Sequence, residues 1–530
     1  MRAALLPSLL AAVVQAQGAF KFGAAYSTSP SQVPLQLAGG HDWDTAPSEH
    51  ATGHLLFDSV SSLMQRWPNT VVRPGHTIVP ALIPAGTILY HGLPTGSSLP
   101  PHPDWLAFSF THAYEFAGGP DGHVITLSTS RPLRLLYFDG SSAAKVRDGS
   151  YDTQEVVMWG EVRDEGARGA RDDVKILERL CEWGVPRGVD GFVRMEYHFE
   201  VMQCNLTSGL TLLASSPVLP QQTPHYPSDP QKPRPPTWRG SLPSTNGESR
   251  VEGKWADRAP GETRVWVLYD RLSTFYDPAL TSLFDVRRGR PRELHRLKGI
   301  SKEEAGMKLR ELEDVAAQLD TNGWDAHSQS QSGVDWASIT HVVVERYAQR
   351  LELLSYTLSS SSSYPSVRAR ASKARAQVLT MLAPYFTTAD SPRADDDVAS
   401  KGWLAPVVQR CSTTHTAGIP ASLLTPQERL IRDAVADVTR EICRRLGRMF
   451  HAAFDVEDPA LSEEEVRGVV GFMQEEVDAL MGWLDWTSVW LGCRPACSIE
   501  EMCVVPTWPF EDGEDENDTR HPRCVRLPNV

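Results

Sequence analysis

The chain lacks the short motifs that by themselves identify an enzyme class. It contains no Walker-type phosphate loop, no H-E-x-x-H zinc-protease helix and no G-x-S-x-G nucleophile elbow. Positive charge is also in the minority, because 52 Lys and Arg stand against 66 Asp and Glu, which gives a net charge of −14. This balance argues against general attraction to nucleic acid or anionic lipid, so no nucleic-acid partner is expected.

Long hydrophobic runs are absent beyond the N-terminus. No stretch after residue 16 approaches the roughly 18 apolar residues of a spanning helix, so no membrane span is expected. The N-terminus has one cation, Arg2, a mostly apolar run to Val14, and then Ala16, which suits signal peptidase. This order predicts a signal peptide, residues 1–16, and a secreted protein, with a buried N-terminal helix as the alternative.

The cysteines agree with secretion. All of them follow the proposed cleavage site, and an even number in a secretory context predicts disulfides. They are Cys181, Cys204, Cys411, Cys443, Cys493, Cys497, Cys503 and Cys524. If pairing stays within domains, Cys181 pairs with Cys204, whereas the connectivity of the other six is open. A zinc knuckle among the last four is the alternative.

Two sequons predict N-glycosylation of a secreted chain. Asn205 lies in Asn-Leu-Thr and Asn517 in Asn-Asp-Thr.

The apolar periodicity changes from strand-like to helical along the chain, which predicts the α+β class. The expected parts are a signal peptide at 1–16, a mixed α+β domain at 17–216, a proline-rich linker at 217–262, a predominantly helical domain at 263–490 and a cysteine-containing acidic tail at 491–530.

Strand-like and helix-like patterns alternate in the first domain. Strands are expected in short pieces within 77–90, then at 105–110, 124–128, 133–138, 156–162 and 191–202; helices are expected at 55–67, 111–117 and 172–183. In the second domain, a Ser or Thr followed three residues later by Glu predicts helix starts at Ser301, Thr425 and Ser462.

A basic run follows the linker. Its members are Arg287, Arg288, Arg290, Arg292, Arg296 and Lys298. We expect a solvated loop here, and a dibasic processing site is the alternative.

The stretch 86–116 combines a strand, a glycine turn, aromatic side chains and ionisable groups. The Tyr90-His91-Gly92 sequence would expose His91 where a ligand can approach the glycine backbone. Phe110 and Tyr114 would present flat faces to a planar ring. This stretch therefore predicts the wall of a ligand pocket.

Together with Glu200 on a later strand, this stretch resembles the ADP-ribosyltransferase fold. The resemblance implies NAD as substrate, with His91 binding a ribose hydroxyl, Tyr114 stacking on nicotinamide and Glu200 stabilising the oxocarbenium-like centre. The sequence departs from that family because it has no E-x-E motif.

The whole chain also resembles a family of large secreted fungal proteins without assigned function. The segments that carry this resemblance include GHLLFDSVSSLMQRWPNT, CEWGVPRGVDGFVRMEYHFEVMQCN and CRPACSIEEMC. The family supplies no catalytic residues.

Two functional hypotheses follow. In the first, a secreted glycoprotein acts by binding an extracellular ligand or a cell-wall component, without cofactor. In the second, the first domain acts on NAD as an ADP-ribosyltransferase or glycohydrolase. Whether the protein is an enzyme is left open by the sequence.

Overall fold

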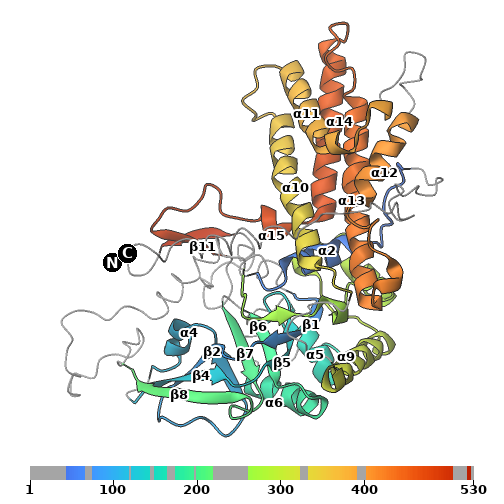
Figure 1. Cartoon of the computed structure of the whole chain (residues 1–530). Helices are drawn as coiled ribbons and strands as arrows, with labels where there is room; N and C mark the ends of the chain where they lie inside the picture. The colour runs from blue at the N-terminus through green and yellow to red at the C-terminus, as the bar shows by residue number, and fades with distance from the viewer. Residues whose placement is uncertain are drawn as a thin grey trace, which may run out of the picture. The chain divides into compact units, whose positions relative to one another are not determined.

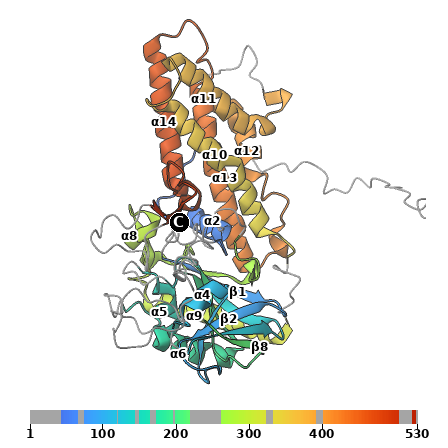
Figure 2. The same ribbon diagram turned by 90° about the vertical axis from the view of Figure 1, so that its left-hand side faces the viewer.

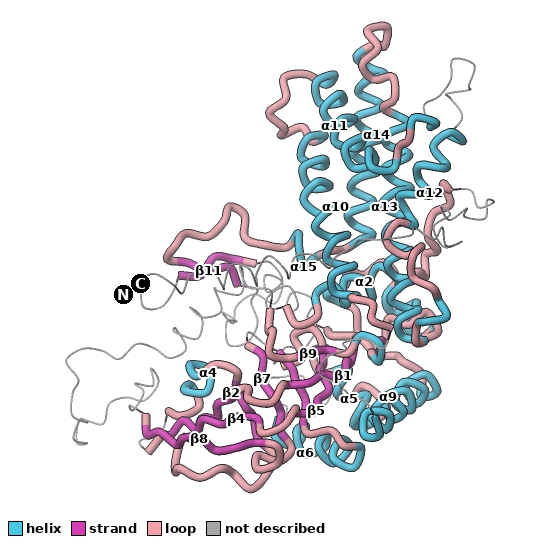
Figure 3. Tube along the Cα trace, viewed as in Figure 1, coloured by secondary structure: helices cyan, strands magenta, loops and turns pink. Residues whose placement is uncertain are grey.

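The computed structural model describes most of the chain from residue 43 onward. The described residues are 43–65, 74–118, 121–143, 149–163, 173–195, 198–218, 261–322, 332–390, 401–504 and 522–526. The predicted signal peptide and almost all of the predicted linker lie outside them. Trp43–Val530 forms one compact unit, with a strand-rich part followed by a helical part (Figure 3). The predicted α+β class is confirmed.

A mixed sheet forms the strand-rich part (Figure 1). Its strands are β1 (Thr77–Ile83), β2 (Ile88–Leu93), β3 (Asp104–Ala107), β4 (His123–Thr129), β5 (Leu133–Phe138), β6 (Gly191–Met195), β7 (Phe199–Gln203), β8 (Leu210–Pro217), β9 (Trp266–Val267) and β10 (Ser273–Thr274). The order is β10-β1-β5-β6-β7-β3-β2-β4-β8, and β9 also pairs with β1. Neighbouring strands are antiparallel except for the parallel pair β5 and β6.

Two of the strand predictions are wrong. Residues expected as a strand at 156–162 belong largely to helix α5 (Asp152–Trp159). The β-branched Val156 and Val157 favour strands locally, but both are buried by packing of the helix against the sheet, so tertiary contacts override propensity. The single strand expected at 191–202 is the antiparallel pair β6 and β7, and β8 was not predicted.

The other helices include α2 and the long helices of the second half. Their bounds are α2 (Gly53–Ser62), α4 (Phe110–Glu115), α6 (Asp173–Gly184), α8 (Phe284–Arg287), α9 (Lys302–Asn322), α10 (Trp336–Leu358), α11 (Val367–Leu382), α12 (Ala405–Thr413), α13 (Pro426–Ala452), α14 (Glu463–Leu484) and α15 (Thr487–Trp490). Two short strands, β11 (Glu501–Val504) and β12 (Arg523–Arg526), pair near the C-terminus. None of the helices in the described ranges is long and apolar enough to cross a membrane.

The predicted helix starts are confirmed. Thr425 and Ser462 each form a capping box with the Glu three residues on, at the first turns of α13 and α14. Ser301 Oγ accepts a hydrogen bond of 3.2 Å from the Glu304 amide at the start of α9. These side chains satisfy amide groups that have no partner within the helix.

The two faces of the sheet have different coverings. Because directly paired residues share a face and neighbours along a strand alternate, Val79 and Tyr137 point to one face and Ile78 and Phe138 to the other. Side chains of the first face belong to the core that includes α2 and the long helices. Those of the second face pack with α5, α6 and α9. We call these the α2 face and the α6 face.

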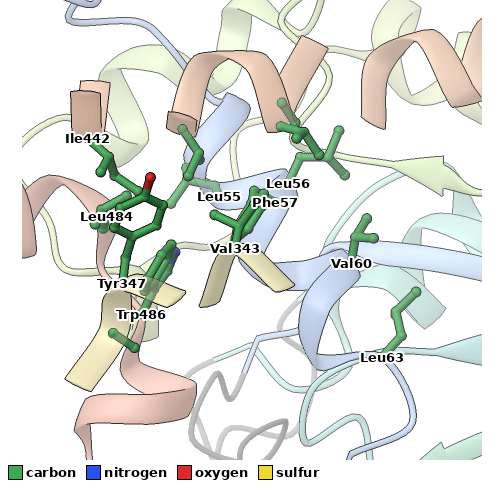
Figure 4. Packing of buried hydrophobic residues seen from close by; sticks show 14 of the residues in the cluster. Leu55, Leu56, Phe57, Val60, Leu63, Val343, Tyr347, Ile442, Leu484 and Trp486 are labelled. Carbon is green, nitrogen blue, oxygen red and sulfur yellow. The ribbon is translucent and has the colours of Figure 1, made fainter. Parts of the chain in front are cut away.

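Helix α2 lies between the sheet and the long helices in both views (Figures 1 and 2). Every side chain from Leu55 to Ser62 is buried, as expected of a helix enclosed on all sides. The Phe57 ring lies 5.7 Å from the Trp486 ring, centroid to centroid, within a cluster that includes Tyr347 (Figure 4). On the sheet side, Ser59 Oγ donates a 2.6 Å hydrogen bond to Asp139 Oδ2. The helix thus joins the two parts of the unit.

Truncation of Phe57 tests this role. We expect Phe57→Ala to lower the free energy of unfolding by about 3–5 kcal/mol, because it leaves a cavity where α2 packs on Trp486. Phe116→Ala is the matched control, since Phe116 is exposed, and should change stability by no more than about 0.5 kcal/mol. Urea unfolding measures both, and equal losses in the two variants would contradict the central position of α2.

Candidate functional site

The predicted aromatic wall is present on the α6 face of the sheet. The Tyr90 ring on β2 meets the Phe110 ring edge-on at 5.7 Å, and Phe110 stacks with Tyr114 on α4 at 6.0 Å. Phe110 and Phe116 are 44% and 57% exposed, although both are large and apolar. We call Tyr90, Phe110, Tyr114 and Phe116 the α4 aromatic face. The sequence interpretation missed Phe116, which lies only two residues after Tyr114.

Helix α4 packs so closely on β2 that residue 92 must be glycine. A Cβ atom at Gly92 would lie 1.9 Å from the Ala113 carbonyl oxygen, so any side chain here would displace the helix. The start of α4 is fixed by Ser109, whose hydroxyl accepts a hydrogen bond from the His112 amide at 3.3 Å. The close approach that the glycine permits is therefore that of a helix of the same chain, where the sequence suggested a ligand.

His91 points away from this wall. Tyr90 pairs with Ala107, and Ala107 with Glu200, so these three share the α6 face and His91 lies on the α2 face. The His91 side chain is buried, and its Nδ1 lies 2.8 Å from the Trp105 carbonyl oxygen, which makes Nδ1 the protonated nitrogen. Its Nε2 lies 3.8 Å from Asp104 Oδ2.

Glu200 is held by a buried cation that the sequence interpretation missed. Glu200 Oε1 accepts a 2.6 Å hydrogen bond from Arg194 Nε, and Arg194 is buried between Trp105 and Tyr151. Burial by itself lowers the pKa of Arg194, but Glu200, together with Tyr151 and Asp173, raises it above its ordinary value. The carboxylate therefore stabilises a buried arginine, an interaction that accounts for an acid at this position without chemistry.

The structure brings together only part of the predicted site. Tyr90, Gly92, Phe110 and Tyr114 meet at α4, whereas His91 lies across the sheet from them. The three residues assigned to NAD chemistry, His91, Tyr114 and Glu200, do not surround one ligand position. What the arrangement offers is a set of flat aromatic surfaces. Burial raises the pKa of Tyr114, so its hydroxyl stays protonated at neutral pH and can donate a hydrogen bond.

All eight cysteines form disulfides, and no free cysteine remains. The predicted pair Cys181–Cys204 is confirmed, with an S–S distance of 2.00 Å. The others are Cys411–Cys443, Cys493–Cys503 and Cys497–Cys524. The sulfurs considered for a zinc knuckle are thus engaged in disulfides, which leaves them no thiolate to offer a metal.

The first sequon is open to solvent. Asn205 follows Cys204 in the turn between β7 and β8, and both Asn205 and Thr207 are exposed. The Asn205 side-chain oxygen accepts hydrogen bonds from the Thr207 amide (2.9 Å) and hydroxyl (2.7 Å). The second sequon, at Asn517, lies outside the described residues.

Replacement of Glu200 tests its structural role. Glu200→Gln removes the nearer of the two carboxylates that pair with Arg194, the other being Asp173 at 3.7 Å, so we expect a loss of roughly 1–3 kcal/mol in the free energy of unfolding. Glu182→Gln is the control, because the Glu182 side chain is 66% exposed and pairs with Arg179 only at the surface. Urea titration should separate the two; an E200Q variant as stable as E182Q would show that Arg194 does not need the carboxylate.

Comparison with known proteins gives relatives without an assigned activity. A family model described as the YPL277C N-terminal domain matches residues 119–225. The chain is 22% identical to the uncharacterized protein YOR389W of Saccharomyces cerevisiae, over 86% of this chain and 81% of that protein. It is 27% identical to the uncharacterized protein YPL277C of the same yeast, over 30% of this chain and 42% of that protein. No solved structure matches. None of the three is described as an ADP-ribosyltransferase, and the chain is similar over most of its length to an uncharacterised yeast protein.

Proposed function

We propose that the protein is a secreted, disulfide-bonded glycoprotein that acts by binding a cell-wall component through the α4 aromatic face. The observation that carries this proposal is the exposure of Phe110, whose ring contacts the half-buried Tyr90 and Tyr114, and of Phe116 at the end of the same helix. Aromatic side chains on a surface present flat apolar faces that fit planar or sugar rings, and the tyrosine hydroxyls add polar tips. His91 and NAD have no part in this proposal.

The cysteine pairing supports an oxidising compartment. Disulfides persist outside the cytosol. Reduction in the cytosol would open four disulfides, three of which join cysteines 23 to 32 residues apart. The pair Cys411–Cys443 joins α12 to α13, and Cys181–Cys204 joins α6 to the end of β7. Secretion by way of the predicted signal peptide accounts for this pairing.

A rigid attachment of α4 supports binding. Gly92 brings the helix directly onto β2, and Ala113 and Ala117 are buried beneath it. The exposed rings are therefore presented by a short helix with little freedom to reorient. A preorganised aromatic surface loses less entropy when it binds a ligand than a mobile one does.

Glycosylation is tested at Asn205. We expect protein recovered from culture medium to gain mobility in gel electrophoresis after N-glycan removal, because the sequon is exposed and follows a disulfide-anchored turn. Asn205→Gln and Thr207→Ala should each remove one glycan, whereas Ser208→Ala should not. A protein whose mobility is the same in all three variants and before and after enzymatic removal would contradict glycosylation here.

The binding surface is tested with insoluble yeast cell-wall particles. We expect the double variant Phe110→Ser, Phe116→Ser to bind at least about tenfold more weakly than the unmodified protein, since two exposed rings contribute on the order of 1 kcal/mol or more. The control is Leu353→Ser, Tyr356→Ser on α10, two side chains with similar exposure. Co-sedimentation measures binding, and thermal unfolding verifies that both variants fold. Equal loss in both, or no binding by the unmodified protein, would refute the proposed surface.

A further inference from the structure

The basic run at 287–298 is only partly the solvated loop that its composition suggests. Arg288 and Arg290 are exposed, but Arg287 and Arg292 are buried, so the prediction of a solvated loop is wrong for these two. The two buried arginines flank the exposed residues 288–291, so they lie directly beneath a surface loop. Since a buried guanidinium requires compensation, the partners of each one decide its role.

Two arginines of this run pair with fully buried carboxylates. The Arg292 guanidinium pairs with Asp58 on α2, and both side chains are almost fully buried. Arg296 makes two hydrogen bonds to Asp152, of 2.8 and 2.9 Å. Against the effect of burial, Asp58 raises the pKa of Arg292. The fold therefore supplies counter-ions where it uses these cations structurally.

Arg287 has no such partner. It ends α8 and is 6% exposed, yet Nε, Nη1 and Nη2 all lack a hydrogen-bond acceptor within the described part of the chain. Burial lowers the pKa of Arg287 to about 10, and the neighbouring Tyr276 counters this only in part. A guanidinium carries five N–H donors, and leaving them all unsatisfied in the interior is costly.

The nearby carboxylates of Asp58 and Asp139 bind other donors and make no hydrogen bond with Arg287. Asp58 accepts from Arg292 on one oxygen and from Ser488 (2.8 Å) on the other. Asp139 accepts from the Thr77 amide (2.7 Å) and from the Ser59 hydroxyl. Among the described residues, the Arg287 guanidinium is thus left without an acceptor.

Three further side chains contact the Tyr276 ring together with Arg287: those of His76, His295 and Arg292. The Tyr276 ring stacks on His76 at 4.5 Å and meets His295 edge-on at 6.3 Å. The Arg287 and Arg292 guanidinium carbons lie 4.9 and 5.4 Å from its centroid. The Tyr276 hydroxyl accepts a 3.4 Å hydrogen bond from Arg292, and within the described ranges it donates none. Its own proton is therefore available to an acceptor.

Each of the two histidines, His76 and His295, has one buried ring nitrogen without a hydrogen-bond partner among the described residues. His76 Nδ1 donates to the Pro74 carbonyl (2.8 Å) and His295 Nε2 to the Arg290 carbonyl (3.0 Å), so His76 Nε2 and His295 Nδ1 are the unprotonated nitrogens. Each becomes a further donor if it takes up a proton.

We propose that Arg287, Arg292, His76, His295 and Tyr276 form a binding site for a small tetrahedral oxyanion, of the chemistry of inorganic phosphate or sulfate. Such a dianion accepts several hydrogen bonds at once, which matches the unpaired Arg287 guanidinium, the Tyr276 phenol and the two imidazoles that contact the Tyr276 ring. The site shares no residue with the α4 aromatic face and goes beyond the binding function proposed above.

Anion binding at this site is coupled to proton uptake. Burial and the Arg287 charge lower the pKa of His295 to about 4 and that of His76 well below its ordinary value. The other ionisable groups around the two histidines are Arg290, Arg292, Tyr276, Asp58, Asp139 and His54. Burial lowers the pKa of His54 to about 3. A bound dianion offsets the repulsion by the arginines, so the imidazoles protonate more readily in the complex. Affinity should therefore rise as pH falls.

The test compares thermal unfolding of the full-length protein, freed of phosphate and sulfate, with and without each anion at constant ionic strength. We expect sulfate and phosphate to raise Tm by several degrees, and chloride not to. Arg287→Met should abolish this shift and should unfold at an equal or higher temperature than the unmodified protein in anion-free buffer, because it removes an unpaired buried charge. Arg288→Met, at the exposed neighbour, should keep the shift.

Several results would overturn the site. They are the absence of an anion shift in the unmodified protein, an equal shift in Arg287→Met, and a response to acetate but not to sulfate. A lower Tm for Arg287→Met with the sulfate shift intact would instead make Arg287 a packing residue. Calorimetric titration with sulfate, which keeps its charge over this range, should give several-fold tighter binding at about pH 5.5 than at about pH 7.5. Binding independent of pH would exclude the two histidines.

Discussion

The buried ion pair between Asp58 and Arg292 is the constraint on which the rest of the structure depends. Asp58 lies on α2, and Arg292 comes from the loop after α8, so the pair fixes that loop against a helix far away in the sequence. Ser488 and Asp485, at the end of the long-helix segment, bind the same two residues. Removing either charge would leave the other buried without compensation, which is far more costly than losing an exposed pair.

One hydrophobic core runs from the sheet through α2 to the long helices. Helix α2 is enclosed on all sides, since apolar residues reach it from the sheet and from α10, α13 and α14. The two parts that the sequence suggests as separate domains therefore share buried side chains at this helix. Whether the boundaries at 217–262 also divide the chain functionally stays a prediction, because nearly all of that segment lies outside the described residues.

The two faces of the sheet also carry different sets of aromatic and ionisable side chains. The α6 face carries the aromatic rings around α4 and the Arg194–Glu200 pair, while the α2 face carries His91 and leads to the polar groups around Tyr276. The aromatic rings are exposed, which suits contact with a large insoluble partner. The groups around Tyr276 are buried and rich in donors, which suits a small anion that can be enclosed. One chain thus combines an exposed aromatic surface with a buried arginine that lacks an acceptor among the described residues.

Much of this could be predicted from the sequence where the signal is local. The helix starts at Thr425 and Ser462 follow from side chains that bond within one turn. The Cys181–Cys204 pair follows because these two cysteines precede the proline-rich segment and the other six follow it. The α+β class follows from the change in apolar periodicity. These features depend on neighbours in the sequence, so no knowledge of the fold is needed to infer them.

Only the tertiary structure decided which side chains share a face of the sheet and which charged residues are buried. A one-residue step along β2 puts His91 on the opposite face from Tyr90, and only the pairing with β3 and β7 shows which face holds Glu200. The basic run gives no sign that Arg287 and Arg292 are buried while Arg288 is exposed, because burial depends on what packs above each residue. The sequence by itself determined the class of fold, and it predicts secretion. The partners of each charge were set by contacts between distant segments, since only the folded chain brings Asp58 to Arg292 and leaves Arg287 without a counterpart.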